Sequence, residues 1–150
     1  LPVMSAAKHN RELIEREFGV TIFNKFKHCP IPQQKSVLVE MEERYPEIFD
    51  QVSRSRFRHP DDLSITSALH HYYAFCTGRA VPASLRYVYQ DIAREDTRRR
   101  LVNLLRERDT DVFCLNDHES PESDMDTQQE ILAEFLQAQF PVPSPYERES

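Results

Sequence analysis

The sequence predicts an α/β fold that is predominantly helical and contains one short parallel βαβ unit. Apolar residues recur at helical spacing through most of the chain, and only short stretches have the composition of strands. Strand-like residues occupy 87–90 and 112–115, on either side of a helical pattern at 94–108. A strand, a helix and a strand within about thirty residues typically form a right-handed unit with parallel strands.

Glycine and proline mark the ends of the helices predicted in the first half of the chain. Ser5 is placed to cap a first helix through 10–18, and Gly19 follows that helix at the usual stop position. A second helix is predicted at 33–44, and Pro46 opens a short third one. These local signals predict three helices before residue 53.

The longest predicted helix runs from Pro60 to about Thr77. Pro60 suits a first helical position because its missing N–H would have no partner there, and Gly78 suits the position after the last turn. Its apolar stripe consists of Ile65, Leu69, Tyr72, Tyr73 and Cys76.

We expect one domain over 1–150, since a chain of this length forms one ordinary globular domain. Its predicted parts are a helical region at 33–78, the βαβ unit at 86–117, a final helix at 127–140 and an extended tail at 141–150.

Composition excludes several classes of protein. The net charge of −6 argues against nucleic acid as the main partner. No apolar run approaches the roughly 20 residues that a membrane-spanning helix needs. The three cysteines are scattered and form no C-x-x-C pair, which favours reduced thiols in a cytosol-like compartment over a disulfide framework or a zinc site.

A cationic segment at 53–62 is the first candidate for function. It places Arg54, Arg56, Arg58 and His59 directly before the longest predicted helix. An arginine fork matches two phosphate oxygens at once, so this loop is suited to phosphate binding. Solvated arginines, or arginines paired with nearby carboxylates, are the structural alternative.

Asn116 and Asp117 follow the second predicted strand. In parallel α/β sheets, ligands bind beyond the carboxyl ends of the strands, so these two residues are well placed for a site. An Asx turn explains the same pair of residues without a ligand, and metal ligation by Asp117 is a third option.

Several stretches together resemble the Stealth family of sugar-1-phosphate transferases. The third conserved region of that family is similar to K-H-C-P-I-P at 27–32, S-V-L-V-E-M-E-E-R-Y-P-E-I-F at 36–49 and R-F-R-H-P-D-D-L-S at 56–64. The fourth is similar to F-C-L-N-D at 113–117 and F-L-Q-A-Q-F-P-V-P-S-P-Y-E at 135–147. The resemblance covers nearly the whole chain in order, and it is strongest to the bacterial branch.

The resemblance implies transfer of a sugar 1-phosphate from a UDP-sugar to a hydroxyl of a glycan acceptor, with release of UMP. It also implies a Rossmann-like catalytic core, a divalent metal ion (Mg or Mn) and a role in capsular polysaccharide or exopolysaccharide synthesis. We expect a cytoplasmic location, for which peripheral association with the inner face of the membrane is one option.

The motifs carry the family's site residues onto this chain. His28 falls on the histidine of the H-x-P motif and Arg58 on the last arginine of R-F-R, which implies that both are catalytic. Arg56, Asn116 and Asp117 are the expected substrate-binding residues. His28 could take the acceptor's proton or donate one to the leaving phosphate, and a purely structural histidine is the alternative. Arg58 could instead pair with a neighbouring aspartate.

The family's first and second conserved regions have no counterpart here. We therefore expect this chain to be the carboxyl-terminal half of the enzyme's core, inactive alone, with the missing N-terminal half as its partner. A helical interaction module that completes a partner chain is the alternative function. If His28, Arg58 and Asn116 share one pocket the enzyme is favoured, and if they scatter the module is favoured.

Overall fold

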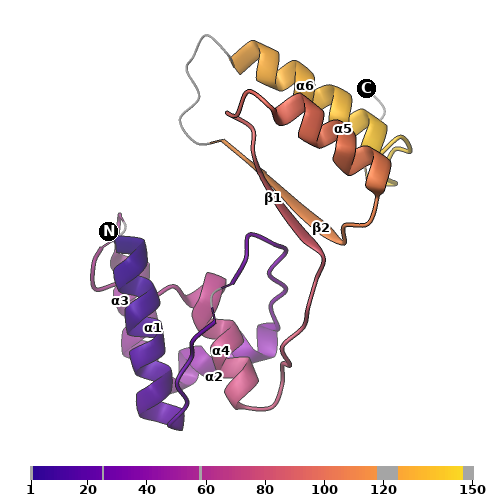
Figure 1. The fold of residues 1–150 in the computed structure, drawn as a ribbon. Coiled ribbons are helices and arrows are strands. Elements are labelled where there is room, and N and C mark those ends of the chain that lie inside the picture. The colour runs from indigo at the N-terminus through magenta and orange to yellow at the C-terminus, as the bar shows by residue number, and fades with distance from the viewer. Residues whose placement is uncertain (1, 25, 58, 118–124, 147–150) are drawn as a thin grey trace. The chain divides into compact units, whose positions relative to one another are not determined.

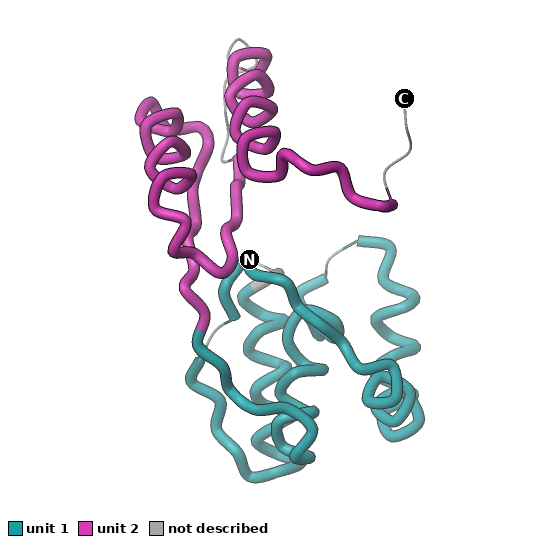
Figure 2. Tube along the Cα trace, turned by 90° about the vertical axis from the view of Figure 1, so that its right-hand side faces the viewer, with its two compact units in different colours: residues 1–84 teal, residues 85–150 magenta. Residues whose placement is uncertain are grey.

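The computed structural model describes residues 2–24, 26–57, 59–117 and 125–146. The chain divides into two compact units, residues 1–84 and residues 85–150, drawn in different colours in Figure 2. Unit 1 is helical, and unit 2 holds a two-stranded parallel sheet with two helices. The described residues thus have the mixed α/β fold that the sequence predicts, whereas the single domain over 1–150 stays a prediction.

Unit 1 contains a core of buried apolar side chains contributed by all of its longer helices except the third. Its α-helices, labelled in Figure 1, are α1 (Pro2–Phe18), α2 (Lys35–Arg44), α3 (Pro46–Arg54) and α4 (His70–Cys76), and the π-helical turn η1 (Ile65–Leu69) directly precedes α4. The core residues that are buried most completely are Leu13, Ile14, Val37, Met41, Leu69, Tyr73 and Ala74. No helix in the described residues is both long and apolar enough to cross a membrane.

The helix ends that the sequence predicts at Gly19 and Gly78 are confirmed. Gly19 has φ +65° and donates its N–H to the carbonyl of Glu15, which closes the last turn of α1. Gly78 has φ +73°, and Arg79 just after it donates to the carbonyl of Ala74 at 2.7 Å. Both glycines adopt the left-handed conformation that other residues rarely take, so each ends its helix at the predicted place.

The prediction that Pro60 opens the longest helix is wrong. Residues 60–64 are not helical, and the helix begins at Ile65. Pro60 instead lies in a turn in which the Asp62 N–H bonds to the carbonyl of His59 at 3.1 Å and the Asp62 carboxylate accepts the His59 N–H at 2.7 Å. The carboxylate therefore closes a turn before the helix, and the first helical turn starts after Ser64.

Unit 2 contains the predicted βαβ unit and one further helix. Strand β1 (Tyr87–Asp91), helix α5 (Thr97–Glu107), strand β2 (Val112–Asn116) and helix α6 (Met125–Gln139) follow one another. The strands are parallel and in register from Tyr87 opposite Val112 to Asp91 opposite Asn116. Where the strands begin, the Asp111 carboxylate accepts bonds from the Arg86 amide and guanidinium, which fixes that register.

Both helices of unit 2 pack on the same face of the sheet. Gln90 on β1 donates to the hydroxyl of Thr97 on α5, and the Phe113 ring on β2 contacts Phe135 on α6. Gln90 and Phe113 point to one face because strand residues alternate and the register pairs Val88 with Phe113. The half-buried side chains of Tyr87, Tyr89, Asp91, Val112, Cys114 and Asn116 occupy the other face, which neither helix covers.

Candidate functional site

A cavity of about 820 Å³ in unit 1 contains one of the two predicted catalytic residues, His28. Its wall is built from α1, from the segment around Phe26–Ile31, from the turn around His59 and from η1. The polar and charged residues that line it are Lys8, Arg11, Glu12, Glu15, Lys27, His28, His59, Asp62, Ser64 and Ser67.

The segment that carries His28 is held against α4 by aromatic contacts. The Phe26 ring stacks on Tyr72 at 5.2 Å between centroids and meets the edge of His71 at 5.1 Å. A ring nitrogen of His71 also lies 2.9 Å from the carbonyl of Pro32. His28 is exposed at the cavity, between these two anchored points, so its imidazole is accessible to a ligand.

The turn at 59–62 places a second histidine in the cavity wall. Besides closing the turn, the Asp62 carboxylate accepts a hydrogen bond from the Ser55 hydroxyl at 2.8 Å. The His59 amide and then the Ser55 hydroxyl lower the pKa of Asp62, because both donate to its charged form. The Nδ1 atom of His59 lies 3.2 Å from the Asp61 N and 3.4 Å from the Asp61 carboxylate.

Cationic and acidic side chains are equal in number in the cavity wall, which holds Lys8, Arg11 and Lys27 together with Glu12, Glu15 and Asp62. Glu12 pairs with Lys8 at 3.4 Å, and Glu15 accepts a hydrogen bond from the Thr21 hydroxyl at 3.2 Å. Asp62 is bound within its turn, as described above. The carboxylates of the cavity therefore each have a contact of their own, which leaves Arg11 to interact with an anionic ligand.

The predicted site residues in the described part of the chain belong to both units. His28 lines the cavity, whereas Arg56 does not and is exposed with its guanidinium 6.0 Å from the Phe57 ring centre. Arg58 lies outside the described residues. Asn116 and Asp117 belong to unit 2, so their predicted meeting with His28 and Arg58 stays a prediction.

Asn116 and Asp117 lie where the two strands of unit 2 end. Asp91 is opposite Asn116 in the register, which adds a carboxylate that we did not predict at this edge. The Asp91 side chain accepts the Ala93 N–H at 3.0 Å, and the Ile92 N–H bonds to the Asn116 carbonyl at 2.9 Å. In the described part of the chain, no three His, Cys, Asp or Glu side chains gather as a metal centre.

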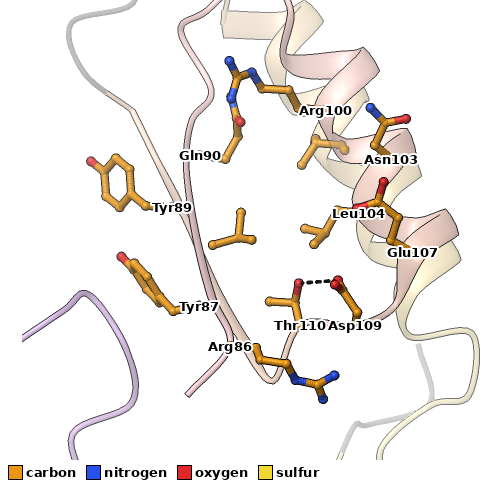
Figure 3. A pocket seen from close by; sticks show the side chains of 12 residues that line it. Arg86, Tyr87, Tyr89, Gln90, Arg100, Asn103, Leu104, Glu107, Asp109 and Thr110 are labelled. Atoms are coloured by element: carbon orange, nitrogen blue, oxygen red, sulfur yellow. Dashed lines mark hydrogen bonds between the residues drawn. The ribbon is translucent and has the colours of Figure 1, made fainter. Parts of the chain in front are cut away.

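A second cavity, of about 410 Å³, lies in unit 2 beside β1 (Figure 3). Five consecutive residues, Arg86–Gln90, line it together with α5, and no residue of β2 does. Consecutive residues point to both faces of a strand, so the cavity follows the outer edge of β1. Figure 3 shows Tyr87 and Tyr89 pointing away from α5, while Gln90 points toward it.

Family models match most of the residues that carry this geometry. The third conserved region of Stealth proteins matches residues 27–75, which include His28 and the turn at 59–62. The fourth conserved region of Stealth proteins matches residues 103–150, which include β2 and α6. Together the two models cover more than half of the chain, so the resemblance that the motifs predict is confirmed.

Relatives with curated names agree with these matches. An exopolysaccharide phosphotransferase of Streptomyces coelicolor is 51% identical over 147 residues, which are 98% of this chain and 25% of the relative. The exopolysaccharide phosphotransferase CpsY of Mycobacterium tuberculosis is 40% identical over 145 residues, which are 96% of this chain and 27% of the relative. The chain thus spans about a quarter of the length of the relatives that it matches. It belongs to the Stealth family and carries that family's third and fourth conserved regions.

Proposed function

We propose that this chain is part of a transferase that moves a sugar 1-phosphate from a UDP-sugar to a hydroxyl of a glycan acceptor. The pathway would be synthesis of capsular polysaccharide or exopolysaccharide, in line with the names of its relatives. The observation that carries the proposal is the cavity of unit 1, whose wall contains His28 of the third conserved region together with Arg11 and Lys27. Such a cavity suits a negatively charged diphosphate and a proton transfer beside it.

The proposed reaction forms one bond and breaks one. The acceptor oxygen bonds to the phosphorus next to the sugar, and the bond from that phosphorus to the bridging oxygen of UMP breaks. The hydroxyl proton leaves the acceptor, and UMP departs with the bridging oxygen. Cations near the phosphates stabilise the charge that spreads over their oxygens in the transition state.

His28 is the proposed proton-transfer group. An imidazole changes protonation near neutral pH, so it can take the acceptor proton or donate one to the departing phosphate. Its exposed position at the cavity, on a segment anchored by Phe26 and Pro32, gives a ligand access to the ring. Arg58, two residues after Arg56 and next to His59, is the proposed cation of this step.

We also propose that the sheet of unit 2 is part of a larger, Rossmann-like sheet. Among the described residues of unit 2, no strand pairs with the outer edge of β1, and neither helix of this unit covers the second face of the sheet. Parallel sheets usually have both faces covered, so this geometry suits additional strands and helices from elsewhere in a longer protein. The chain spans about a quarter of the length of its relatives, which supports the same view.

The resemblance also leads us to propose a divalent metal ion, Mg²⁺ or Mn²⁺, for the active protein. The described residues alone do not fit such a centre, since no suitable cluster of three ligands occurs among them. The expected cytoplasmic location stays a prediction as well.

The proposal is tested by UMP release in the complete protein that contains this chain. A panel of UDP-sugars is supplied with a polysaccharide acceptor, and wild type is compared with His28→Ala, Arg58→Ala and the control His9→Ala. His9 lies on α1 but does not line the cavity. We expect the control to keep its activity and His28→Ala to lose about a hundredfold or more, the usual contribution of acid–base catalysis.

Two results would contradict the proposal. Turnover by His28→Ala at the wild-type rate would remove the proton-transfer role. Wild-type protein that releases no UMP from any UDP-sugar would favour the alternative function, an interaction module.

A further inference from the structure

Arg11 lines the same cavity as His28, and it has no partner among the described residues. Its Nε atom is buried and makes no hydrogen bond, and no ion pair joins its guanidinium to a described carboxylate. The residue as a whole is half-buried on α1. An arginine in this state has lost part of its hydration without gaining a protein contact in return.

The lack of a partner is unusual because acidic neighbours are close in sequence. Glu12 is adjacent, and Glu15 is four residues further on the same helix, the spacing of a helical ion pair. Glu12 is instead paired with Lys8, and Glu15 with Thr21. Most other arginines of the described residues have a carboxylate partner, among them Arg16, Arg44, Arg54, Arg79, Arg86, Arg94, Arg98, Arg99, Arg100 and Arg106.

A buried donor without an acceptor destabilises a protein, so each one in a native structure needs an explanation. The terminal guanidinium nitrogens of Arg11, unlike Nε, are not among the buried atoms, so an anion bound in the cavity can supply acceptor oxygens to them. A guanidinium fork fits two oxygens of one phosphate, and Lys27 also lines the cavity.

We propose that Arg11 binds a phosphate group of the sugar-nucleotide donor inside the cavity of unit 1. The identity of the donor rests on the proposed function, whereas the binding of phosphate rests on the geometry around Arg11. Arg11 lies outside the segments that match the Stealth models, since the third conserved region begins at residue 27. Its role would add α1 to the elements that hold the donor.

Inorganic pyrophosphate is the probe for this proposal, because it tests the phosphate site without any turnover. Binding to the 150-residue chain is measured by titration calorimetry for wild type, Arg11→Met, Arg11→Lys and the control Arg16→Met. Arg16 lies on the same helix, is exposed and does not line the cavity. Thermal unfolding is followed for each protein with and without pyrophosphate.

We expect Arg11→Met to bind pyrophosphate about tenfold more weakly or worse, and Arg16→Met to bind like wild type. Without pyrophosphate, Arg11→Met should unfold at the wild-type temperature or above it, because the unpartnered donor is gone. With pyrophosphate, wild type should gain stability and Arg11→Met should not. If Arg11 only supported the fold, Arg11→Met would unfold at a lower temperature than wild type without pyrophosphate, and pyrophosphate would stabilise both proteins equally.

Wild type that fails to bind pyrophosphate, or Arg11→Met that binds it equally well, would overturn the proposal. If Arg11→Met does not fold, Arg11→Lys decides, because it keeps the charge and removes the fork. Arg11→Lys should bind pyrophosphate severalfold more weakly than wild type, and equal binding by the two proteins would count against the proposal. A complete protein without UDP-sugar turnover would refute the proposed donor and leave the pyrophosphate result standing.

Discussion

Asn10 on α1 and Ser64 before η1 are joined by two hydrogen bonds across 54 residues of sequence. The Asn10 side chain donates to the Ser64 carbonyl at 3.0 Å and accepts the Ser64 N–H at 3.1 Å. Asn10 is completely buried, and the Ser64 carbonyl also accepts the first bonds of η1, from Ala68 and Leu69. One buried amide therefore holds the start of the η1–α4 segment to the helix that carries Arg11.

Substitution Asn10→Ala should destabilise the chain by about 2 to 4 kcal/mol, because two hydrogen bonds are lost and the Ser64 N–H is left without a partner, whereas the Ser64 carbonyl keeps its bonds from Ala68 and Leu69. Urea unfolding followed by circular dichroism measures the change. Glu12→Ala is the control, since its ion pair with Lys8 is exposed and should contribute little. Equal midpoints for Asn10→Ala and wild type would show that the Asn10 contact does not stabilise the fold.

The contrast between Gly19 and Pro60 shows which helix ends a sequence can predict. Gly19 ends α1 through its own conformation and a bond to Glu15, four residues away, so a local pattern contains the whole cause. The helix after Pro60 starts late because the Asp62 carboxylate closes a turn and distant Asn10 holds Ser64. A contact across 54 residues leaves no local signal, so a proline that suits a helix start gave the wrong prediction.

The buried Tyr73 side chain supports a second stability prediction. Its hydroxyl donates to Glu40 at 2.6 Å, and Glu40 also holds Arg79 through two bonds of 2.6 and 2.9 Å. Tyr73→Phe should cost about 1 kcal/mol, less than a fully buried charged hydrogen bond, because Glu40 is partly exposed. The matched control is Tyr72→Phe, whose hydroxyl makes a longer bond of 3.4 Å and should matter less.

Chemical unfolding of Tyr73→Phe, Tyr72→Phe and wild type provides the measurement. The aromatic contacts of both rings remain in these variants, so a difference reports on the hydroxyl groups alone. A larger loss for Tyr72→Phe than for Tyr73→Phe would contradict the assignment of the Glu40 network as the stronger contact.

The turn at 59–62 gives a pH prediction. The His59 amide and the Ser55 hydroxyl lower the pKa of Asp62 below its usual value of 3.8. Because the Asp62 pKa is lowered in the folded protein, the ionised Asp62 carboxylate stabilises the turn fully above about pH 4. This stabilisation is lost as the pH falls through the pKa that Asp62 has in the folded protein. Ser55→Ala should raise the Asp62 pKa toward 3.8, measured by an NMR titration of the side-chain carboxyl. A lower pKa in Ser55→Ala would contradict the assigned bond.

Asp96, directly before α5, gives a second prediction about pH, which covers a wider pH range. Its bonds to Arg100 and then Arg94 lower the pKa of this carboxyl to about 2. Its stabilisation of the start of α5 should be complete above about pH 4 and disappear between about pH 4 and pH 2. Wild type should therefore unfold at a higher temperature than Asp96→Asn at neutral pH, with the difference shrinking toward pH 2. A difference that is constant with pH would rule out the lowered pKa as its cause.

Residues of the candidate site could be predicted from the sequence where they belong to a motif. They could not be predicted where only contacts in the folded structure identify them. His28 is part of an H-x-P motif, which marked it as a site residue, and the structure shows that it lines a cavity, while its catalytic role stays a prediction. Arg11 was missed because Arg11 and Glu15 have the spacing of an ordinary helical ion pair. Only the structure shows that Glu15 bonds to Thr21 instead, which leaves the Nε atom of Arg11 without a partner.

The unpaired outer edge of β1 supports a final prediction about the complete protein. In the 150-residue chain, the β1 amides that do not bond to β2 should exchange quickly with deuterium, because they face the cavity beside Arg86–Gln90. If further strands extend the sheet, as proposed, the same amides should exchange about a hundredfold more slowly in the complete protein. The amide of Leu101, buried in α5, serves as a control that is protected in both. Equal exchange rates for the outer β1 amides in both proteins would mean that no strand pairs with this edge, and the Rossmann-like extension would have to be abandoned.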